Sequence, residues 1–169
     1  VRSVTDALTA SGFPIQIADR AISIAPNGAA SALELETEPY PGFPTAMQAQ
    51  MCALLSTSKG TSFVTENVFP QRYMHVAELK RMGAQMQMQD ATAVIDGVDC
   101  LLGAPVMASD LRASAALVLA GLKAEGVTEV SRVYHPSEWQ KRYQEFSDNQ
   151  HRLLDERRKA RGTKAEVRR

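Results

Sequence analysis

Two charged residues, Asp110 and Arg112, open an otherwise apolar segment that runs over residues 113–122. A carboxylate in the first turn of a helix suits the positive end of the helix dipole. An arginine beside free backbone N–H groups at the same end can hold a carboxylate or phosphate. The pair is therefore either a structural ion pair or an anion-binding site, and the spacing alone slightly favours the ion pair.

The segment behind this pair is expected to be a helix, with Ser109 as its N-cap. Leu111, Val118 and Leu122 form one apolar stripe, and small or apolar residues, Leu119 among them, fill the other sides. A helix that is apolar all round is typically buried on all sides. We therefore expect residues 110–123 to be nearly inaccessible to solvent.

A second apolar helix is expected over residues 46–57, with Thr45 as its N-cap. Residues 8–24 resemble residues 79–95 at an offset of 71, and a weaker similarity at an offset of 66 follows each apolar helix. Together they predict a repeated unit of strand, helix, strand, helix, strand, strand.

The repeats divide the chain into units of about 1–28, 29–97 and 98–135, followed by a polar helix and tail over 136–169. Only the middle unit is complete. The sequence thus begins inside a repeat, which predicts a fragment or one piece of a split protein.

The composition limits the function. The chain is 44% hydrophobic, enough for a core, and its formal net charge is zero, so no nucleic-acid partner is expected. Its apolar runs are too short to span a membrane. Cys52 and Cys100 lie in apolar segments and are expected to be buried free thiols in a reducing cytoplasm.

Several other residues are expected to be structural. His75 is a lone histidine, for which a structural role is more common than a catalytic one. Met82, Met86 and Met88 are expected to fill the core. The basic tail, residues 151–169, is expected to be a solvated helix with a frayed end. A nucleic-acid role for it is a minor alternative, because no aromatic residues lie between its charges.

Three stretches carry a specific resemblance: PYPGFPTAMQAQ at 39–50, ENVFPQRYMHVAELKRMGA at 66–84 and GAPVMASDLRASAALVLAGLKAEG at 103–126. They resemble the C-terminal part of the UDP-N-acetylglucosamine enolpyruvyl transferases. The resemblance implies an α/β fold of the inside-out barrel type, built of βαβαββ units with helices inside and sheets outside, of which this chain is a part.

The implied reaction moves the enolpyruvyl group of phosphoenolpyruvate to the 3-hydroxyl of UDP-N-acetylglucosamine, the first committed step of peptidoglycan synthesis. The family needs no metal and no organic cofactor. Its active site lies between two lobes, so a separate N-terminal lobe is an expected partner, and this chain alone is expected to be inactive.

The resemblance also assigns site residues. Arg112 matches an arginine of the phosphoenolpyruvate site, and Asp110 matches an aspartate beside it; both are taken as catalytic. Val68, Phe69 and Arg72, with Arg112, are taken as substrate-binding, since the first three match a loop that touches the nucleotide sugar.

Two positions depart from the family pattern. Ala46 stands where the family has an aspartate that serves proton transfer, and alanine can neither take nor give a proton. Glu138 stands where the family has an arginine, so the charge is reversed. These departures keep an alternative open, a degenerate, non-catalytic relative that binds a nucleotide sugar or a partner protein.

Overall fold

The structure is a computed structural model that describes residues 1–25 and 28–132. The chain divides into two compact units, Val1–Tyr134 and His135–Arg169. Glu138 and the helix and tail expected over 136–169 lie outside the described residues.

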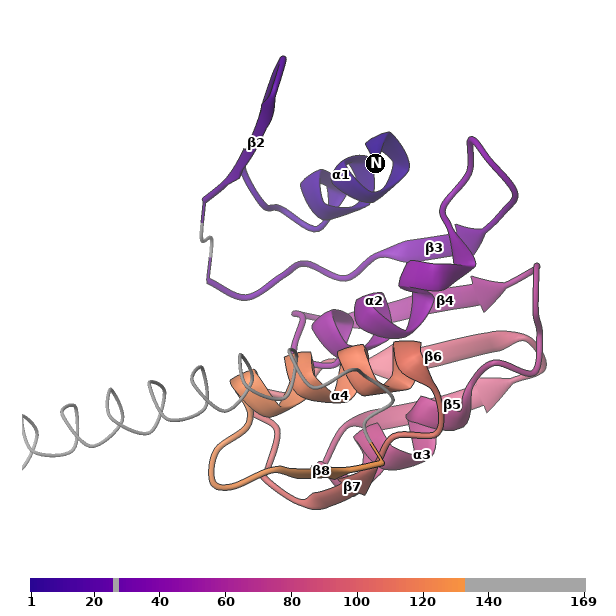
Figure 1. The fold of residues 1–169 in the computed structure, drawn as a ribbon, viewed down its shortest axis with the longest axis vertical. Helices are drawn as coiled ribbons and strands as arrows, with labels where there is room; N and C mark the ends of the chain where they lie inside the picture. The colour runs from indigo at the N-terminus through magenta and orange to yellow at the C-terminus, as the bar shows by residue number, and fades with distance from the viewer. Residues whose placement is uncertain (26–27, 133–169) are drawn as a thin grey trace, which may run out of the picture. The chain divides into compact units, whose positions relative to one another are not determined.

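The elements of the first unit follow the repeated order that the sequence predicts. They are α1 (Arg2–Ala10), β1 (Ile15–Ala18), β2 (Ala21–Ile24), β3 (Glu34–Thr37), the 3₁₀ helix η1 (Thr45–Met47), α2 (Gln48–Leu55), β4 (Thr61–Glu66), α3 (Met74–Arg81), β5 (Gln85–Gln89), β6 (Thr92–Asp96), β7 (Pro105–Met107), α4 (Leu111–Lys123) and β8 (Glu129–Ser131) (Figure 1). From β3 to β6 the order is βαβαββ, with αββ before it and βαβ after it.

A four-stranded sheet with the order β3-β4-β6-β5 forms the middle of the unit. β3 and β4 pair in parallel through the crossover helix α2, whereas β4–β6 and β5–β6 are antiparallel. Along β4, Ser62, Val64 and Glu66 are buried, while Thr61 and Phe63 are exposed. One face of this strand therefore meets the core and the other meets solvent.

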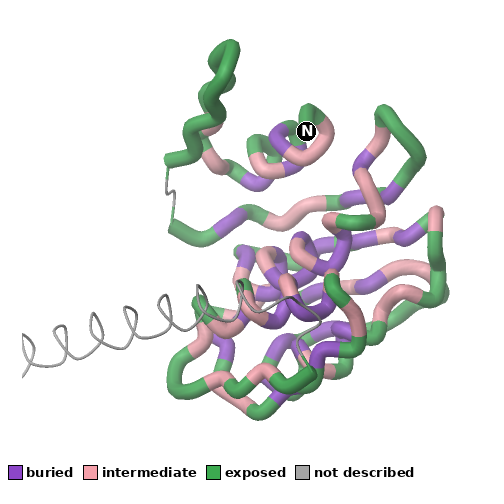
Figure 2. Tube along the Cα trace, viewed as in Figure 1, coloured by how far each residue is buried: buried purple, intermediate pink, exposed green. Residues whose placement is uncertain are grey.

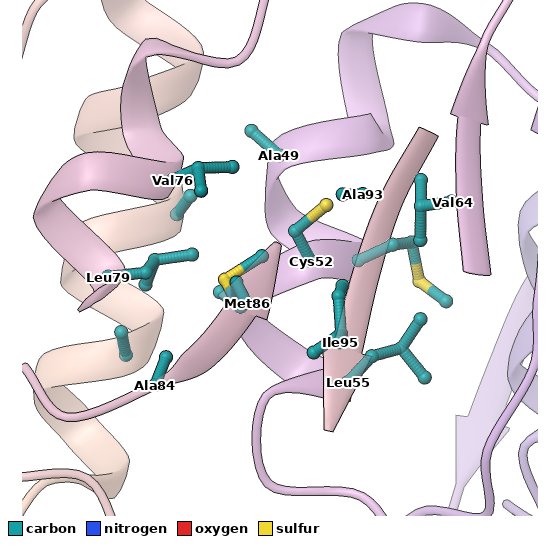
Figure 3. Packing of buried hydrophobic residues seen from close by; sticks show 14 of the residues in the cluster. Ala49, Cys52, Leu55, Val64, Val76, Leu79, Ala84, Met86, Ala93 and Ile95 are labelled. Atoms are coloured by element: carbon teal, nitrogen blue, oxygen red, sulfur yellow. The ribbon is translucent and has the colours of Figure 1, made fainter. Parts of the chain in front are cut away.

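Helices cover the inner face of the sheet. α2 packs against β4 and β6, α3 packs against β5, and α4 packs in turn against α2 and α3. Figure 3 shows Cys52 and Leu55 of α2 directed toward Val64, Ala93 and Ile95 of the strands. None of the residues of α2 is exposed, so this helix is buried on all sides as expected. Helices inside and strands outside are the expected inside-out arrangement.

The expectation that α4 is buried all round is wrong. Leu111 is 51% exposed, Leu119 is 47% exposed and Leu122 is 41% exposed. The side that faces α2 and α3 is buried through small residues and Leu117. On the opposite side, Leu111, Leu119 and Leu122 form an apolar stripe that stays exposed among the described residues. The strands β1 and β2 are likewise exposed along almost their whole length (Figure 2).

Three smaller expectations also need correction. Thr45 does not cap α2, because its hydroxyl donates to the carboxylate of Glu66 instead. Met88 is 40% exposed although it lies on the same face of β5 as the buried Met86, two residues before it. Met82 is buried as expected. Cys52 is buried as expected, but Cys100 is only partly buried; both are free thiols.

Candidate functional site

The N-terminus of α4 is built on Asp110. Its Oδ1 accepts hydrogen bonds from the backbone N–H groups of Arg112, at 2.8 Å, and Ala113, at 3.0 Å. Asp110 is therefore the N-cap, one residue later than the expected Ser109. Both residue types cap well, and the backbone angles of Asp110 decide between them.

The same carboxylate pairs with a cation. Nε of Arg112 lies 3.5 Å from Oδ1 of Asp110, and each side chain is about one-third exposed. Partial burial raises the pKa of Asp110, but the hydrogen bonds from Ala113 and Arg112 and the charge of Arg112 lower it further, so the net shift is downward. The structure thus forms the ion pair that the spacing favoured, with one edge of the guanidinium held by the cap.

A small depression beside this pair collects polar groups from η1, α2, α3, the N-terminus of α4 and the loop before α3. It is lined by Thr45, Gln48, Ala49, Arg72, His75, Asp110, Arg112 and Ala113. Its volume is about 10 Å³, room for about one water molecule. Arg72 and Arg112, which lie far apart in the sequence, meet here with a single acidic residue among the lining residues.

Three helix N-termini converge on this depression. Gln48 is the first residue of α2, His75 is the second of α3 and Ala113 is the third of α4. The free N–H groups and positive dipole ends of helices favour anions. With two arginines added, the lining suits a carboxylate or phosphate group better than a cation.

The loop before α3 is fixed at several points. The N–H groups of Val68 and Phe69 each donate to Oε1 of Glu66 at 3.0 Å. The guanidinium of Arg72 lies 3.5 Å from the ring centroid of Phe69, a cation–π contact, and the N–H of Arg72 donates to the carbonyl of Phe69. The structure therefore brings Phe69 and Arg72 together, although Val68 and Phe69 do not line the depression.

Ala46 lies in η1, next to Thr45 of the lining, and is exposed. Its methyl group stands where the resemblance leads one to expect a proton-transferring carboxylate. Among the described residues that line the depression, Asp110 is the only acid. Glu138, the second expected departure, lies outside the described residues.

His75, which is expected from the sequence to be structural, lines the depression. The residue is 3% exposed, and its Nε2 has no hydrogen-bond partner. Burial lowers the pKa of His75 to about 4, and the charge of Asp110 offsets only part of this effect. His75 is therefore neutral at pH 7 and presents an unpaired nitrogen at the lining of the depression.

Sequence reasoning missed Glu66. The alternation of β4 places Ser62, Val64 and Glu66 on one buried face. Following this period of two along the sequence would have put a carboxylate in the core, a signal of an unusual role. Among the described residues, no group of three metal-ligating side chains occurs, and no helix is long and apolar enough to cross a membrane.

The comparisons with known proteins place the chain in a family. The family model described as EPSP synthase (3-phosphoshikimate 1-carboxyvinyltransferase) matches residues 2–149. The UDP-N-acetylglucosamine 1-carboxyvinyltransferase of Methylacidiphilum infernorum is 54% identical over 133 residues, and that of Akkermansia muciniphila is 55% identical over 134 residues. These matches cover 79% and 78% of this chain and 32% of each relative, and they confirm the resemblance seen in the sequence.

Solved structures confirm the fold. The enolpyruvyl transferase NikO from Streptomyces tendae superposes with a TM-score of 0.72 at 23% identity, covering 79% of this chain and 31% of that one. The EPSP synthase from Acinetobacter baumannii superposes with a TM-score of 0.60 at 24% identity, covering 80% and 33%. The chain thus has part of the inside-out α/β fold and spans about a third of the length of its relatives.

Proposed function

Because the chain belongs to the EPSP synthase family, we propose that it forms part of an enzyme that moves the enolpyruvyl group of phosphoenolpyruvate to the 3-hydroxyl of UDP-N-acetylglucosamine. The names of the relatives with more than 50% identity support this choice of substrates. One structural observation supports it most. Arg112, held by Asp110, meets Arg72 where three helix N-termini converge.

The proposed reaction needs a site that binds an anionic substrate. In the overall reaction the sugar oxygen forms a bond to C2 of phosphoenolpyruvate, the bond from C2 to the phosphate oxygen breaks, and the hydroxyl proton is released. Phosphoenolpyruvate carries a carboxylate and a phosphate. An arginine at a helix N-terminus can bind either group with paired hydrogen bonds. We assign Arg112 to this anion, and Asp110 to holding the guanidinium in place.

The loop that carries Val68, Phe69 and Arg72 is assigned to the nucleotide sugar. Phe69 is 45% exposed, so its ring is available to a ligand. Arg72 both stacks on this ring and lines the depression. It could therefore connect a nucleotide-sugar rim to the anion site, although this chain supplies only one side of such a site.

The rest of the site is assigned to the part of the family's length that this chain does not span, in the same polypeptide or a separate one. The exposed stripe of Leu111, Leu119 and Leu122 on α4 supports such a partner. The free thiols support a reducing compartment, and we place the protein in the cytoplasm.

A second function has its own support. Ala46 offers no proton-transferring group beside the depression, and a positioned acid or base commonly contributes about 10²–10⁴-fold in rate. The alternative is a non-catalytic relative that keeps the anion and nucleotide-sugar sites as a binding module. Binding is common to both proposals, and turnover separates them.

The test of the proposed sites uses a chimera in which the full chain replaces the matching third of the Akkermansia muciniphila relative. We expect phosphoenolpyruvate to bind in the presence of UDP-N-acetylglucosamine, measured by calorimetry. Arg112→Ala should weaken this binding at least about tenfold, because a charged hydrogen-bond donor is lost. Lys123→Ala, at the opposite end of α4, is the matched control and should have little effect. Equal losses in both variants would contradict the assignment of Arg112.

A further inference from the structure

Glu66 is a carboxylate in the core of the unit, with no accessible surface. Its Oε1 accepts from the hydroxyl of Thr37 at 2.7 Å and from the N–H groups of Val68 and Phe69 at 3.0 Å. Its Oε2 accepts from the hydroxyl of Thr45 at 2.8 Å. All four neighbours donate to the carboxylate, and two of them, the backbone N–H groups of Val68 and Phe69, can only donate, so the position of Oε1 requires an acceptor.

The carboxylate remains charged without a basic partner. Among the described residues, no lysine, arginine or histidine forms an ion pair with Glu66. Burial raises the pKa of Glu66, but the hydrogen bonds from Thr37, Phe69, Thr45 and Val68 together outweigh burial and lower the pKa below its ordinary value. An apolar residue could fill the same space without this desolvation penalty. The carboxylate therefore has a different use, which is to fix the positions of the groups that donate to it.

The four donors come from three separate segments. Thr37 ends β3, Thr45 begins η1 beside Ala46, and Val68 and Phe69 belong to the loop before α3. Thr37 strengthens the link, because its Oγ1 also accepts from the N–H of Asn67 at 3.0 Å. One carboxylate thus ties the proposed nucleotide-sugar loop to the segment that bears position 46.

The other end of the loop is fixed as well. The hydroxyl of Tyr73 contacts the carbonyl oxygens of Val64, at 2.7 Å, and Ala91, at 3.0 Å. Between the two anchors, Arg72 stacks on Phe69. The loop is therefore held at both ends before any ligand binds, which lowers the ordering entropy of binding.

We propose that Glu66 is a positioning residue for the nucleotide sugar. Its buried carboxylate sets the loop of Val68 and Phe69 in fixed relation to Thr45, and through the loop it places Arg72 at the anion site. The inference rests on the proposed function, because it deepens the role of the same site. It assigns Glu66 no contact with a substrate.

The first test measures amide hydrogen exchange in the full 169-residue chain. Glu66→Gln keeps the size of the side chain but removes the negative charge that strengthens the hydrogen bonds from the N–H groups of Val68 and Phe69. We expect exchange at Val68 and Phe69 to accelerate about tenfold or more relative to amides of the β4–β6 ladder, which report global unfolding. Unchanged relative exchange would overturn the inference.

The matched control is Ser62→Ala. Ser62 is also buried on the inner face of β4, and its hydroxyl accepts from the N–H of Leu33 at 3.1 Å, away from the loop. This variant should not change the relative exchange at Val68 and Phe69. If Glu66→Gln does not fold, Thr45→Val removes one donor to Oε2 and takes its place. Exchange that rises equally in the control overturns the positioning role.

The second test measures steady-state binding of UDP-N-acetylglucosamine and phosphoenolpyruvate to the chimera defined above. Glu66→Gln should raise the Kd for UDP-N-acetylglucosamine about tenfold and change the Kd for phosphoenolpyruvate much less. Ser62→Ala should change neither. A parent chimera that binds no UDP-N-acetylglucosamine overturns the proposed function itself. A parent that binds it, with equal affinity in Glu66→Gln, overturns only the role of Glu66.

Discussion

Oδ1 of Asp110 lies 3.5 Å from Nε of Arg112 while it also accepts the backbone N–H of the same residue at 2.8 Å. One oxygen thus both begins the helix and holds the guanidinium. The two alternatives left open by the sequence, an ion pair and an anion site, are therefore compatible, because the pair leaves the rest of the guanidinium available at the depression.

Substitutions of Asp110 separate its two roles. Asp110→Ala should lower the free energy of unfolding by about 0.5–2 kcal/mol, because it removes an N-cap. Asp110→Asn should preserve most of this stability, since asparagine also caps well, but it removes the charge that holds Arg112. Urea unfolding of the full chain measures both changes. Equal destabilisation by the two substitutions would show that the ion pair, rather than the cap, supplies the stability.

Burial of His75 predicts a loss of stability in mild acid. Its pKa lies at about 4 in the folded chain, against 6.5 for the ordinary group. The unfolded chain therefore binds the proton first as pH falls, and stability present above pH 6.5 is lost progressively toward pH 4. The full shift corresponds to about 3 kcal/mol.

Unfolding by urea at several pH values between 6.5 and 4.5 measures this dependence. Within that window, His75→Gln should give a flatter profile than the parent, because glutamine does not titrate. Glu66 and Asp110, whose pKa values are lowered, contribute stability that is lost mainly below this window. A parent profile that is flat from pH 6.5 to 4.5 would rule out a buried neutral His75.

The sequence predicted the elements well because periodicity and helix ends are local signals. Gly12 and Gly83 follow α1 and α3 with positive φ angles of 92° and 89°, which is the backbone reason for their match in the repeat. The fold class followed from the repeat and the family motifs. The starts of α2 and α4 were predicted less well. Thr45 was expected to cap α2 but bonds Glu66 instead, and Ser109 was expected to cap α4, whose N-cap is Asp110.

The errors share a physical cause. An apolar pattern shows that a helix can be buried, but it does not show which neighbours cover it, so Leu119 was expected inside. Likewise, the hydroxyl of Thr45 could cap α2 or meet a buried acid, and only the folded chain brings Glu66 within 2.8 Å of it. Contacts between distant parts of the chain, such as those of Glu66 with Thr45 and with the loop before α3, therefore hold the candidate site in place and cannot be predicted from local sequence.

The two faces of α4 predict contrasting effects of the same substitution. Leu117 is fully buried, and Leu117→Ala should cost about 2–5 kcal/mol of unfolding free energy. Leu119 is 47% exposed, and Leu119→Ala should cost less than about 1 kcal/mol in this chain. Chemical denaturation of both variants measures the contrast. A large loss for Leu119→Ala would show that the outer face is covered, for example by self-association of the chain.

Release of phosphate from phosphoenolpyruvate in the presence of UDP-N-acetylglucosamine tests the central claim most directly. We predict no turnover by the 169-residue chain alone, and restored turnover by the chimera carrying Ala46→Asp with Glu138→Arg, well above either single change and about 10²–10⁴-fold above the unmodified chimera. Adding Arg112→Ala should abolish that gain. If the double variant binds the nucleotide sugar but releases no phosphate, the transferase account is contradicted and the binding-module alternative stands.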